Sequence, residues 1–145
     1  MTTFDPNCLF CKIIQGEVPS YTVFENSDVK AFLDLSQITK GHVLMVPKKH
    51  LVNLFDYTSE DAKRFLRYIP EIAQAIKASD PHILGMNVAV NNGEIAGQVI
   101  MHSHVHFIPR YSKSEDGLTL KGTNHAADYD EAAYQNVANR IKQQF

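Results

Sequence analysis

The sequence lacks a large excess of either charge. Its 14 lysines and arginines stand against 16 aspartates and glutamates, which gives a formal net charge of −2. It also has no polybasic tract, so the cluster of phosphate-neutralising cations that long duplex nucleic acid needs is missing. A small phosphorylated ligand is still compatible with this composition, because such a ligand needs only a few well-placed polar groups.

Long apolar runs are absent as well. None approaches the roughly 20 residues of a membrane-spanning helix, and residues 1–10 (MTTFDPNCLF) lack the basic-then-apolar pattern of a secretory signal peptide. Cysteine is scarce, with only Cys8 and Cys11 in the chain. Without a secretion signal, a structural disulfide is a poor interpretation of this pair. We therefore expect a cytoplasmic protein without a membrane partner.

The remaining composition is that of a globular protein. Hydrophobic residues make up 44% and charged residues 21% of the chain, and 145 residues suffice for one hydrophobic core. We expect a single domain over residues 1–145, with a core at about 8–111 and a C-terminal extension at 112–145. Short β-prone runs bounded by turn residues predict five strands. These runs are 21–26, 29–35, 42–47, 86–91 and 99–109.

A different periodicity indicates the helices. Apolar residues recur at three- and four-residue steps over 58–79, which predicts one long central helix. Thr58 and Asp61 have the spacing of a capping box, and Pro70 predicts a bend. Together the elements indicate an α+β fold with a five-stranded, largely antiparallel sheet. Two more helices are predicted, a short N-terminal one within 7–16 and a C-terminal one within 128–145.

Three of the seven histidines occupy alternate positions in one short run, as His102, His104 and His106. Side chains of a strand alternate between its two faces, so the three imidazoles are predicted to share one face. Val105 and Phe107 then point the other way, into the core. A solvated or structurally satisfied strand face is the plain interpretation. A metal site or phosphoryl chemistry would instead use the imidazoles directly.

The two cysteines favour a metal site near this run. Cys8-x-x-Cys11 has zinc-ligand spacing, but a tetrahedral structural site needs two further ligands. His50 and one of the three histidines could complete it and tie the N-terminal turn to the sheet. Two buried free thiols or a redox pair are the alternatives, although CLFC lacks the preceding strand of a thioredoxin-like motif.

Two histidines of the run remain if zinc takes the third, and they suit a nucleophile and a supporting imidazole. A neutral imidazole can attack phosphorus if its other nitrogen is held protonated. His42, at the start of a predicted strand, is a candidate partner in that relay. The preceding loop at 91–98 adds Gly97, which lets backbone approach a ligand, and two amide donors, Asn91 and Gln98.

The motif His-φ-His-φ-His-φ-φ, with φ apolar, resembles the signature of the histidine triad family. Three further blocks resemble family segments in the same order, at 8–26, 29–50 and 87–98. The resemblance implies a HIT-like fold, a homodimer and a nucleotidyl hydrolase or transferase acting at the α-phosphate of a purine nucleotide. Its substrates would be nucleoside 5′-phosphoramidates, aminoacyl-adenylates or dinucleoside polyphosphates.

The resemblance also implies roles for individual residues. His104 would be the nucleophile that forms a nucleotidyl-histidine intermediate, and His106 and His42 would orient and polarise the site. The other implied ligand-binding positions are Phe10, Ile13, Phe32 and Leu35 around the base, Asp34 at the ribose, and Asn91, Gly97 and Gln98 at the phosphate.

The cysteine-containing members of the family bind zinc. The implied zinc ligands are Cys8, Cys11, His50 and His102. Four protein ligands leave no open position for water, so the resemblance implies a structural zinc and no catalytic metal.

Two residues depart from the family pattern. Ser103 occupies a φ position, and Val99 stands where adenosine phosphoramidases carry a serine. Two other functions compete with hydrolysis through histidine. One is a zinc-stabilised purine-nucleotide-binding or interaction module with little turnover, and the other is a metal-dependent hydrolase that uses all three histidines of the run as ligands.

Overall fold

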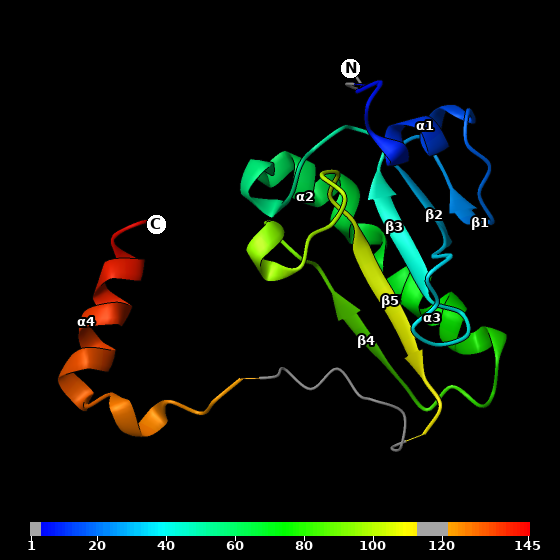
Figure 1. Cartoon of the computed structure of the whole chain (residues 1–145). Helices are drawn as coiled ribbons and strands as arrows, with labels where there is room; N and C mark the ends of the chain where they lie inside the picture. The colour runs from blue at the N-terminus through cyan, green and yellow to red at the C-terminus, as the bar shows by residue number, and fades with distance from the viewer. Residues whose placement is uncertain (1–3, 113–121) are drawn as a thin grey trace.

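The structure is a computed structural model that describes residues 4–112 and 122–145 (Figure 1). None of the helices in these residues combines the length and the apolar character needed to cross a bilayer. The elements are, in order, α1 Leu9–Gln15, β1 Thr22–Glu25, β2 Val29–Leu33, β3 Val43–Pro47, η1 Leu54–Asp56, α2 Ser59–Phe65, η2 Leu66–Tyr68, α3 Ile69–Ser79, β4 Gly85–Ala89, η3 Glu94–Ala96, β5 Val105–Arg110, η4 Ala126–Asp128 and α4 Glu131–Lys142.

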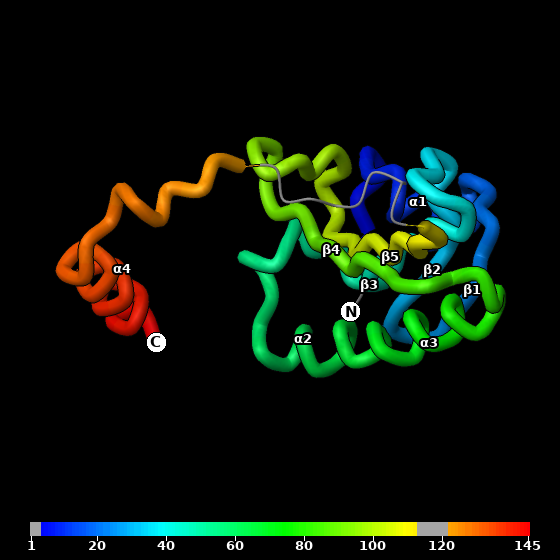
Figure 2. The backbone as a smooth tube through the Cα atoms, turned by 90° about the horizontal axis from the view of Figure 1, so that it is seen from below, coloured from blue at the N-terminus to red at the C-terminus, as the bar shows by residue number. Residues whose placement is uncertain are grey.

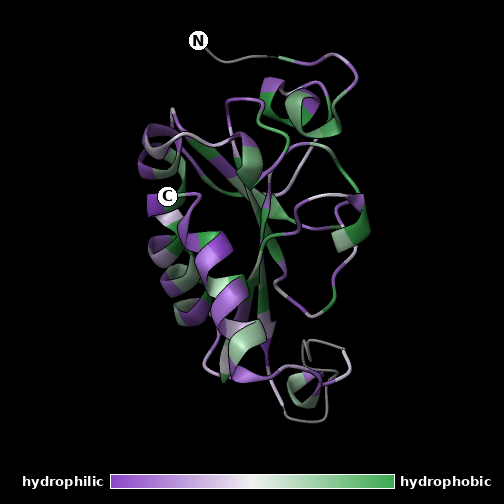
Figure 3. Ribbon diagram, turned by 90° about the vertical axis from the view of Figure 1, so that its left-hand side faces the viewer, coloured by the Kyte–Doolittle hydropathy of each residue, from purple (hydrophilic) through white to green (hydrophobic). Residues whose placement is uncertain are grey.

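One five-stranded sheet organises the chain. Its strand order is β1-β2-β3-β5-β4, and every neighbouring pair is antiparallel. Helices α2 and α3 cover one face of the sheet, while α1 and the connecting loops lie on the other (Figure 2). These observations confirm the predicted α+β fold with a largely antiparallel sheet. Hydrophobic residues are concentrated on the strands between the two layers (Figure 3).

The predicted central helix is interrupted. The 3₁₀ turn η2 separates α2 from α3, so the bend precedes Pro70 rather than occurring at it. Pro70 instead lies in the first turn of α3, where its missing N–H costs no hydrogen bond. The capping box is confirmed, because Thr58 and Asp61 each accept a hydrogen bond from the other's backbone N–H.

The predicted strand at 99–109 begins later than the sequence indicates. Strand β5 starts at Val105, so His102 and His104 precede it, and the prediction of strand over 99–104 is wrong. The chain leaves the ladder there because the N–H of Ser103 donates to the carbonyl of Leu51, at 2.7 Å, in the loop that follows β3. The alternation of side chains nevertheless continues through this stretch: Ser103 and Val105 are buried away from the histidines.

Two hydrophobic clusters fix the sheet between its layers. Between the sheet and the helices α2 and α3, the buried side chains include Phe65, Ile72, Val105 and Phe107, which confirms the predicted core positions on β5. On the opposite face, α1 packs on the sheet. The buried members of that second cluster are Cys8, Phe10, Cys11, Ile13, Phe32, Leu44 and Val46.

Helix α1 is short but well delimited at both ends. At its N-terminus the Cys8 sulfur accepts a hydrogen bond from the N–H of Cys11, and at its C-terminus Gly16 adopts a left-handed conformation with φ 81°. A residue with a Cβ would be strained at that φ. The turn therefore sets the Cys-x-x-Cys pair at the start of α1, facing the sheet.

Candidate functional site

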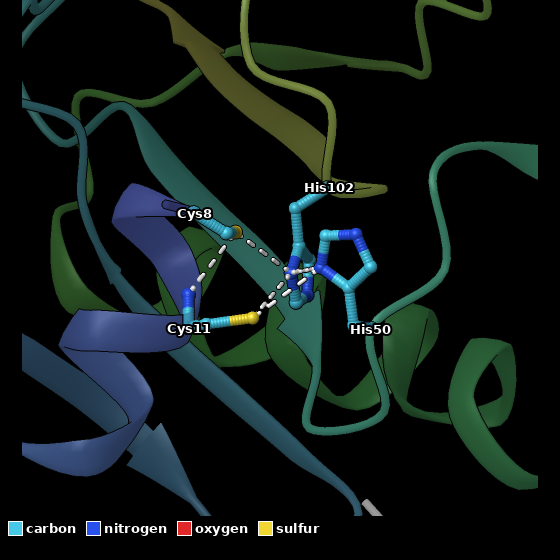
Figure 4. A group of neighbouring side chains, drawn as sticks. All are labelled: Cys8, Cys11, His50 and His102. Atoms are coloured by element: carbon cyan, nitrogen blue, oxygen red, sulfur yellow. Dashed lines mark hydrogen bonds between the residues drawn. The ribbon is translucent and has the colours of Figure 1, made fainter. Parts of the chain in front are cut away.

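Four predicted metal ligands converge beside α1. The sulfurs of Cys8 and Cys11 and one ring nitrogen each of His50 and His102 all lie within 4.8 Å of one another. Figure 4 shows the four side chains pointing toward a common centre. Sulfur–nitrogen separations are 3.4 Å for Cys8 to His102 and 3.3 Å for Cys11 to His50, and the two imidazole Nδ1 atoms are 3.1 Å apart.

These separations are close to those expected around a tetrahedral zinc ion, and the two imidazole nitrogens are slightly nearer to each other. Zinc binds thiolate sulfur at about 2.3 Å and imidazole nitrogen at about 2.0 Å, so ligand atoms around one ion are about 3.3–3.8 Å apart. Two thiols and two imidazoles are a donor set that zinc prefers. Burial raises the pKa of the Cys11 thiol to about 11, so a bound cation would be needed to hold it as a thiolate near neutral pH.

The tautomer of His102 is set from the far side of its ring. Its Nε2 lies 2.8 Å from the carbonyl oxygen of Pro47, which can only accept, so Nε2 carries the hydrogen. The lone pair is therefore on Nδ1, the nitrogen that faces the sulfurs. Burial also lowers the pKa of His102 to about 4, which keeps the imidazole neutral. A carbonyl that orients a histidine in this way is a usual feature of metal sites.

His50 comes from the loop after β3, and its neighbour is anchored to α2. The ammonium of Lys49 lies 2.9 Å from the carboxylate of Asp61, the residue that also caps α2. Asp61 is buried, and its hydrogen bonds to Thr58 and Lys49 lower the pKa of that carboxyl. The ion pair therefore holds the loop that carries His50 against a rigid helix end.

His104 has the opposite arrangement of ring nitrogens. Its Nδ1 lies 2.7 Å from the carbonyl oxygen of His102, so Nδ1 donates and Nε2 keeps the lone pair. The ring is buried, stands edge-on to Phe10 and lines a cavity of about 660 Å³. Burial lowers the pKa of His104, so the imidazole is neutral near pH 7. A neutral imidazole with a free nitrogen at a cavity wall can act as a nucleophile.

A second pair of imidazoles adjoins His104. The backbone N–H of Ile38 donates to Nδ1 of His42 at 3.3 Å, which places the hydrogen of His42 on Nε2. That nitrogen is 3.0 Å from Nδ1 of His106, so His42 donates and His106 accepts. The hydrogen of His106 is then on its Nε2, and the His106 ring lines the same cavity.

Charge and burial act in opposite directions on this pair. Burial lowers the pKa of His42 and lowers that of His106 to about 4. The carboxylate of Asp34 lies 3.5 Å from Nε2 of His42 and raises both pKa values part of the way back. The pair is therefore neutral near pH 7, with a hydrogen available on His106.

Asp34, His42 and His106 also have ligand atoms within 4.8 Å of one another. A cation there would need the lone pair of His42 Nε2. The N–H of Ile38 requires that lone pair on Nδ1 instead, so His42 is a donor toward the cluster. The arrangement favours a chain of hydrogen bonds over a second metal site.

The cavity collects most of the predicted ligand-binding residues. Its lining includes Phe10, Ile13, Phe32, Asp34, Leu35, Asn91 and Gly97, together with His104 and His106. Sequence reasoning did not single out Leu9, Tyr21, Leu44 and Ile100, which also line it. Of these, Leu44 could have been found, because it lies two residues beyond His42 and so shares its face of the strand.

Gln98 differs from its predicted placement. It is 1% exposed and does not line the cavity. Its amide nitrogen donates to the carbonyls of Val52 and Ile100, at 2.6 and 3.0 Å, and its oxygen accepts from the N–H of Gly93 at 2.8 Å. The amide cannot donate to a ligand without breaking one of these bonds. In this structure Gln98 ties the 91–98 loop to the loop that follows β3.

The chain is similar in sequence to proteins of a known family. A sequence model described as the HIT domain matches residues 15–113. The "Protein hit" of Bacillus subtilis (strain 168) is 47% identical over 135 residues, 93% of this chain and 92% of that protein. The adenosine 5′-monophosphoramidase HNT1 of Candida albicans is 35% identical over 127 residues, 86% of this chain and 83% of that protein.

Solved structures agree with the fold. The crystal structure of a HIT family member from Bacillus subtilis superposes with a TM-score of 0.89 at 45% identity, covering 96% of this chain and 97% of that one. The structure of a histidine triad nucleotide-binding protein from Candida albicans gives a TM-score of 0.81 at 32% identity, with 95% and 96% covered.

Proposed function

The chain belongs to the HIT family, and from this premise we propose that it is a nucleotidyl hydrolase that reacts through His104. The substrate is a purine nucleotide attacked at its α-phosphate. The observation that carries the proposal is the orientation of one ring: Nδ1 of His104 is bonded to a carbonyl, and its other nitrogen is left with a lone pair beside a cavity of nucleotide size.

The chemistry proceeds in two displacements. Nε2 of His104 forms a bond to the α-phosphorus, and the bond from phosphorus to the leaving group breaks. The hydrogen on Nε2 of His106 stabilises the charge that develops on the phosphoryl oxygens or the leaving atom, and a leaving amine takes up a proton from solvent. Water then attacks the phosphorus and releases a proton to solvent, the phosphorus–nitrogen bond breaks, and His104 is regenerated with release of the nucleoside monophosphate.

The cavity offers a distinct environment for each part of the nucleotide. Phe10, Ile13 and Phe32 form an apolar wall for the base, and the Asp34 carboxylate can accept hydrogen bonds from ribose hydroxyls. Asn91 and Gly97 lie at the phosphate end. The site thus selects a nucleotide by shape at the base and by hydrogen bonds at the sugar and phosphate.

The charge of the cavity favours one class of leaving group. Among the described residues that line it, Asp34 alone has a charged side chain, and none is a lysine or arginine. A polyphosphate leaving group would bring several negative charges to a wall without cations. A nucleoside phosphoramidate or an aminoacyl-adenylate, which leaves as an amine or a carboxylate, fits better. Val99 adds an 87%-exposed hydrocarbon side chain to this wall.

A zinc ion would be held by Cys8, Cys11, His50 and His102. It would supply structural cross-linking and no open coordination position, because all four ligands come from the protein. His102 is at once a ligand and the source of the carbonyl that orients His104. The metal site therefore supports the nucleophile through one residue. We also propose that the protein is a homodimer, as the family resemblance implies.

The test is to trap the intermediate. The protein is incubated with adenosine 5′-phosphoramidate, quenched in acid-free denaturant and digested, and its peptides are weighed. We expect one adenylate group on the peptide that contains His104, with AMP as product, and neither in the His104→Ala variant. Nucleotide binding without adduct or AMP would instead identify a binding module. Turnover lost on chelation, without an adduct, would identify a metal-dependent hydrolase.

A further inference from the structure

The carbonyl that orients His104 belongs to a peptide group that is itself held from behind. This peptide joins His102 to Ser103. Its oxygen lies 2.7 Å from Nδ1 of His104, and its N–H donates to the carbonyl of Leu51, also at 2.7 Å. Ser103 is 2% exposed, so the bond to Leu51 is shielded from water. One peptide group therefore uses its oxygen toward the ring and its N–H away from it.

A second peptide group continues the line. It joins Leu51 to Val52: its oxygen is the acceptor just described, and its N–H donates to Oδ2 of Asp56 at 3.0 Å. Asp56 is the last residue of η1 and is exposed. Figure 4 shows the two chain segments beside each other at His50, which precedes Leu51, and at His102. Three hydrogen bonds thus connect an exposed carboxylate to the buried ring of the proposed nucleophile.

All three donors in this chain of hydrogen bonds point the same way. His104 donates to the first peptide, the first peptide donates to the second, and the second donates to the carboxylate. The oxygen of each peptide, which is the negative end of its dipole, therefore faces His104, and the charge of Asp56 lies behind both dipoles. Hydrogen bonds in such a chain polarise one another, so a carboxylate at the far end makes the last carbonyl a stronger acceptor.

This polarity matches the charge that the proposed reaction creates. When Nε2 of His104 bonds to phosphorus while Nδ1 keeps its hydrogen, the ring becomes positively charged. Fixed dipoles whose negative ends face the ring stabilise that charge as it develops. The arrangement corresponds to the carboxylate that holds the imidazole of a serine hydrolase, with two peptide groups inserted between carboxylate and ring.

The turn that carries Asp56 is capped by a different side chain. The side-chain oxygen of Asn53 accepts from the N–H of Phe55 at 3.0 Å and caps η1. The Asp56 carboxylate reaches back instead to Val52, whose own carbonyl accepts from the buried amide of Gln98 at 2.6 Å. Asp56 therefore fixes the short stretch to which both the histidine segment and the loop before it are bonded.

We propose that Asp56 is a positioning residue for the reaction at His104 and acts through the two peptide groups described above. The inference rests on the function proposed for His104. The carboxylate fixes the planes of both peptides and directs negative charge toward the ring. Because Asp56 does not line the cavity, its replacement should slow the attack on phosphorus and leave nucleotide affinity intact.

Proton NMR tests the chain of hydrogen bonds in the resting protein. Asp56→Asn keeps an acceptor for Val52 and removes the charge. We expect the Nδ1 proton of His104, assigned by ¹⁵N-histidine labelling, to move upfield in this variant, together with the amide protons of Val52 and Ser103. Glu60→Gln, which removes an exposed carboxylate four residues away, should move none of them. An unmoved His104 proton in Asp56→Asn would overturn the proposal.

Rapid-quench kinetics separates positioning from binding. With adenosine 5′-phosphoramidate we expect Asp56→Asn to slow the appearance of the adduct on His104 by about 3–10-fold, the difference between hydrogen bonds to a charged and to a neutral acceptor. The affinity for AMP, measured by calorimetry, should stay within about twofold. An unchanged rate, or a loss through affinity alone, would refute this role of Asp56. Absence of the adduct in the wild-type protein would refute the proposed function as well.

A backbone variant tests whether the carboxylate acts through Val52. Incorporation of the α-hydroxy acid of valine at this position by nonsense suppression replaces one N–H with an ester oxygen and keeps the side chain. In this background, Asp56→Asn should slow adduct formation no further, because the chain is already broken. An undiminished effect of Asp56→Asn would show that the carboxylate acts by another route and would overturn the proposal.

Discussion

His102 and His104 are the same residue type two positions apart, yet they carry their ring hydrogens on different nitrogens. His102 donates from Nε2 to the carbonyl of Pro47 and offers Nδ1 to the sulfurs. His104 donates from Nδ1 to the carbonyl of His102 and keeps Nε2 free at the cavity. The difference shows that the role of each imidazole is set by the carbonyl behind it, as much as by what it faces.

Replacing the proposed nucleophile should have the largest effect. We expect His104→Ala to lower kcat by on the order of 10⁴-fold or more, because the other imidazole that lines the cavity, His106, carries a hydrogen on the nitrogen that His42 leaves free. Nucleotide binding, measured by calorimetry, should persist. His82→Ala, which removes an exposed histidine that does not line the cavity, is the matched control. Normal turnover by the His104 variant would remove this residue from the mechanism.

Replacing a proposed metal ligand should mainly affect stability. If the cluster holds zinc as proposed, we expect Cys11→Ser to abolish zinc binding and to lower the free energy of unfolding by more than about 2 kcal/mol, because structural zinc contributes folding energy directly. Zinc per chain is measured by elemental analysis and stability by urea denaturation.

The cluster of Asp34, His42 and His106 serves as the control for this prediction. Asp34→Asn should leave the zinc content unchanged, because the tautomer of His42 makes that cluster a chain of hydrogen bonds. Loss of zinc in Asp34→Asn, or its retention in Cys11→Ser, would reverse the assignment of the two clusters.

Removing the donor behind His106 should have an intermediate effect. With His42→Ala, nothing holds the hydrogen of His106 on Nε2, and we expect kcat to fall by about 10²–10³-fold while KM changes little. The tautomer itself is measured from ¹⁵N chemical shifts of the ring. His125→Ala, at an exposed histidine, is the control. An unchanged tautomer of His106 would show that His42 does not orient it.

Much of this site follows from sequence spacing, and the reasons are local. Alternation along an extended chain sets His102, His104 and His106 on one face even where the ladder ends, and Cys-x-x-Cys spans one helical turn. The start of β5 could not be predicted, because it depends on a hydrogen bond from Ser103 to a carbonyl at Leu51, in a distant segment.

Other features depend on contacts that the sequence does not encode locally. The amide of Gln98 is used by carbonyls and N–H groups in two loops, and the tautomer of His42 is fixed by a backbone N–H at Ile38. These backbone partners cannot be recognised from the sequence, because almost every residue offers the same backbone groups.

The smallest expected effect is on the pH dependence of kcat. It tests whether burial keeps His104 and His106 neutral. Attack needs neutral imidazoles, and burial lowers the pKa of His104 and lowers that of His106 to about 4. Because protonation inactivates, kcat should hold through pH 6.5 and fall only as the pH decreases toward 4. The Asp34 carboxylate raises both pKa values, so Asp34→Asn should move the acid limb to still lower pH, whereas Glu60→Gln, at an exposed carboxylate, should not move it. An acid limb at or above pH 6.5 would mean that burial does not govern these rings.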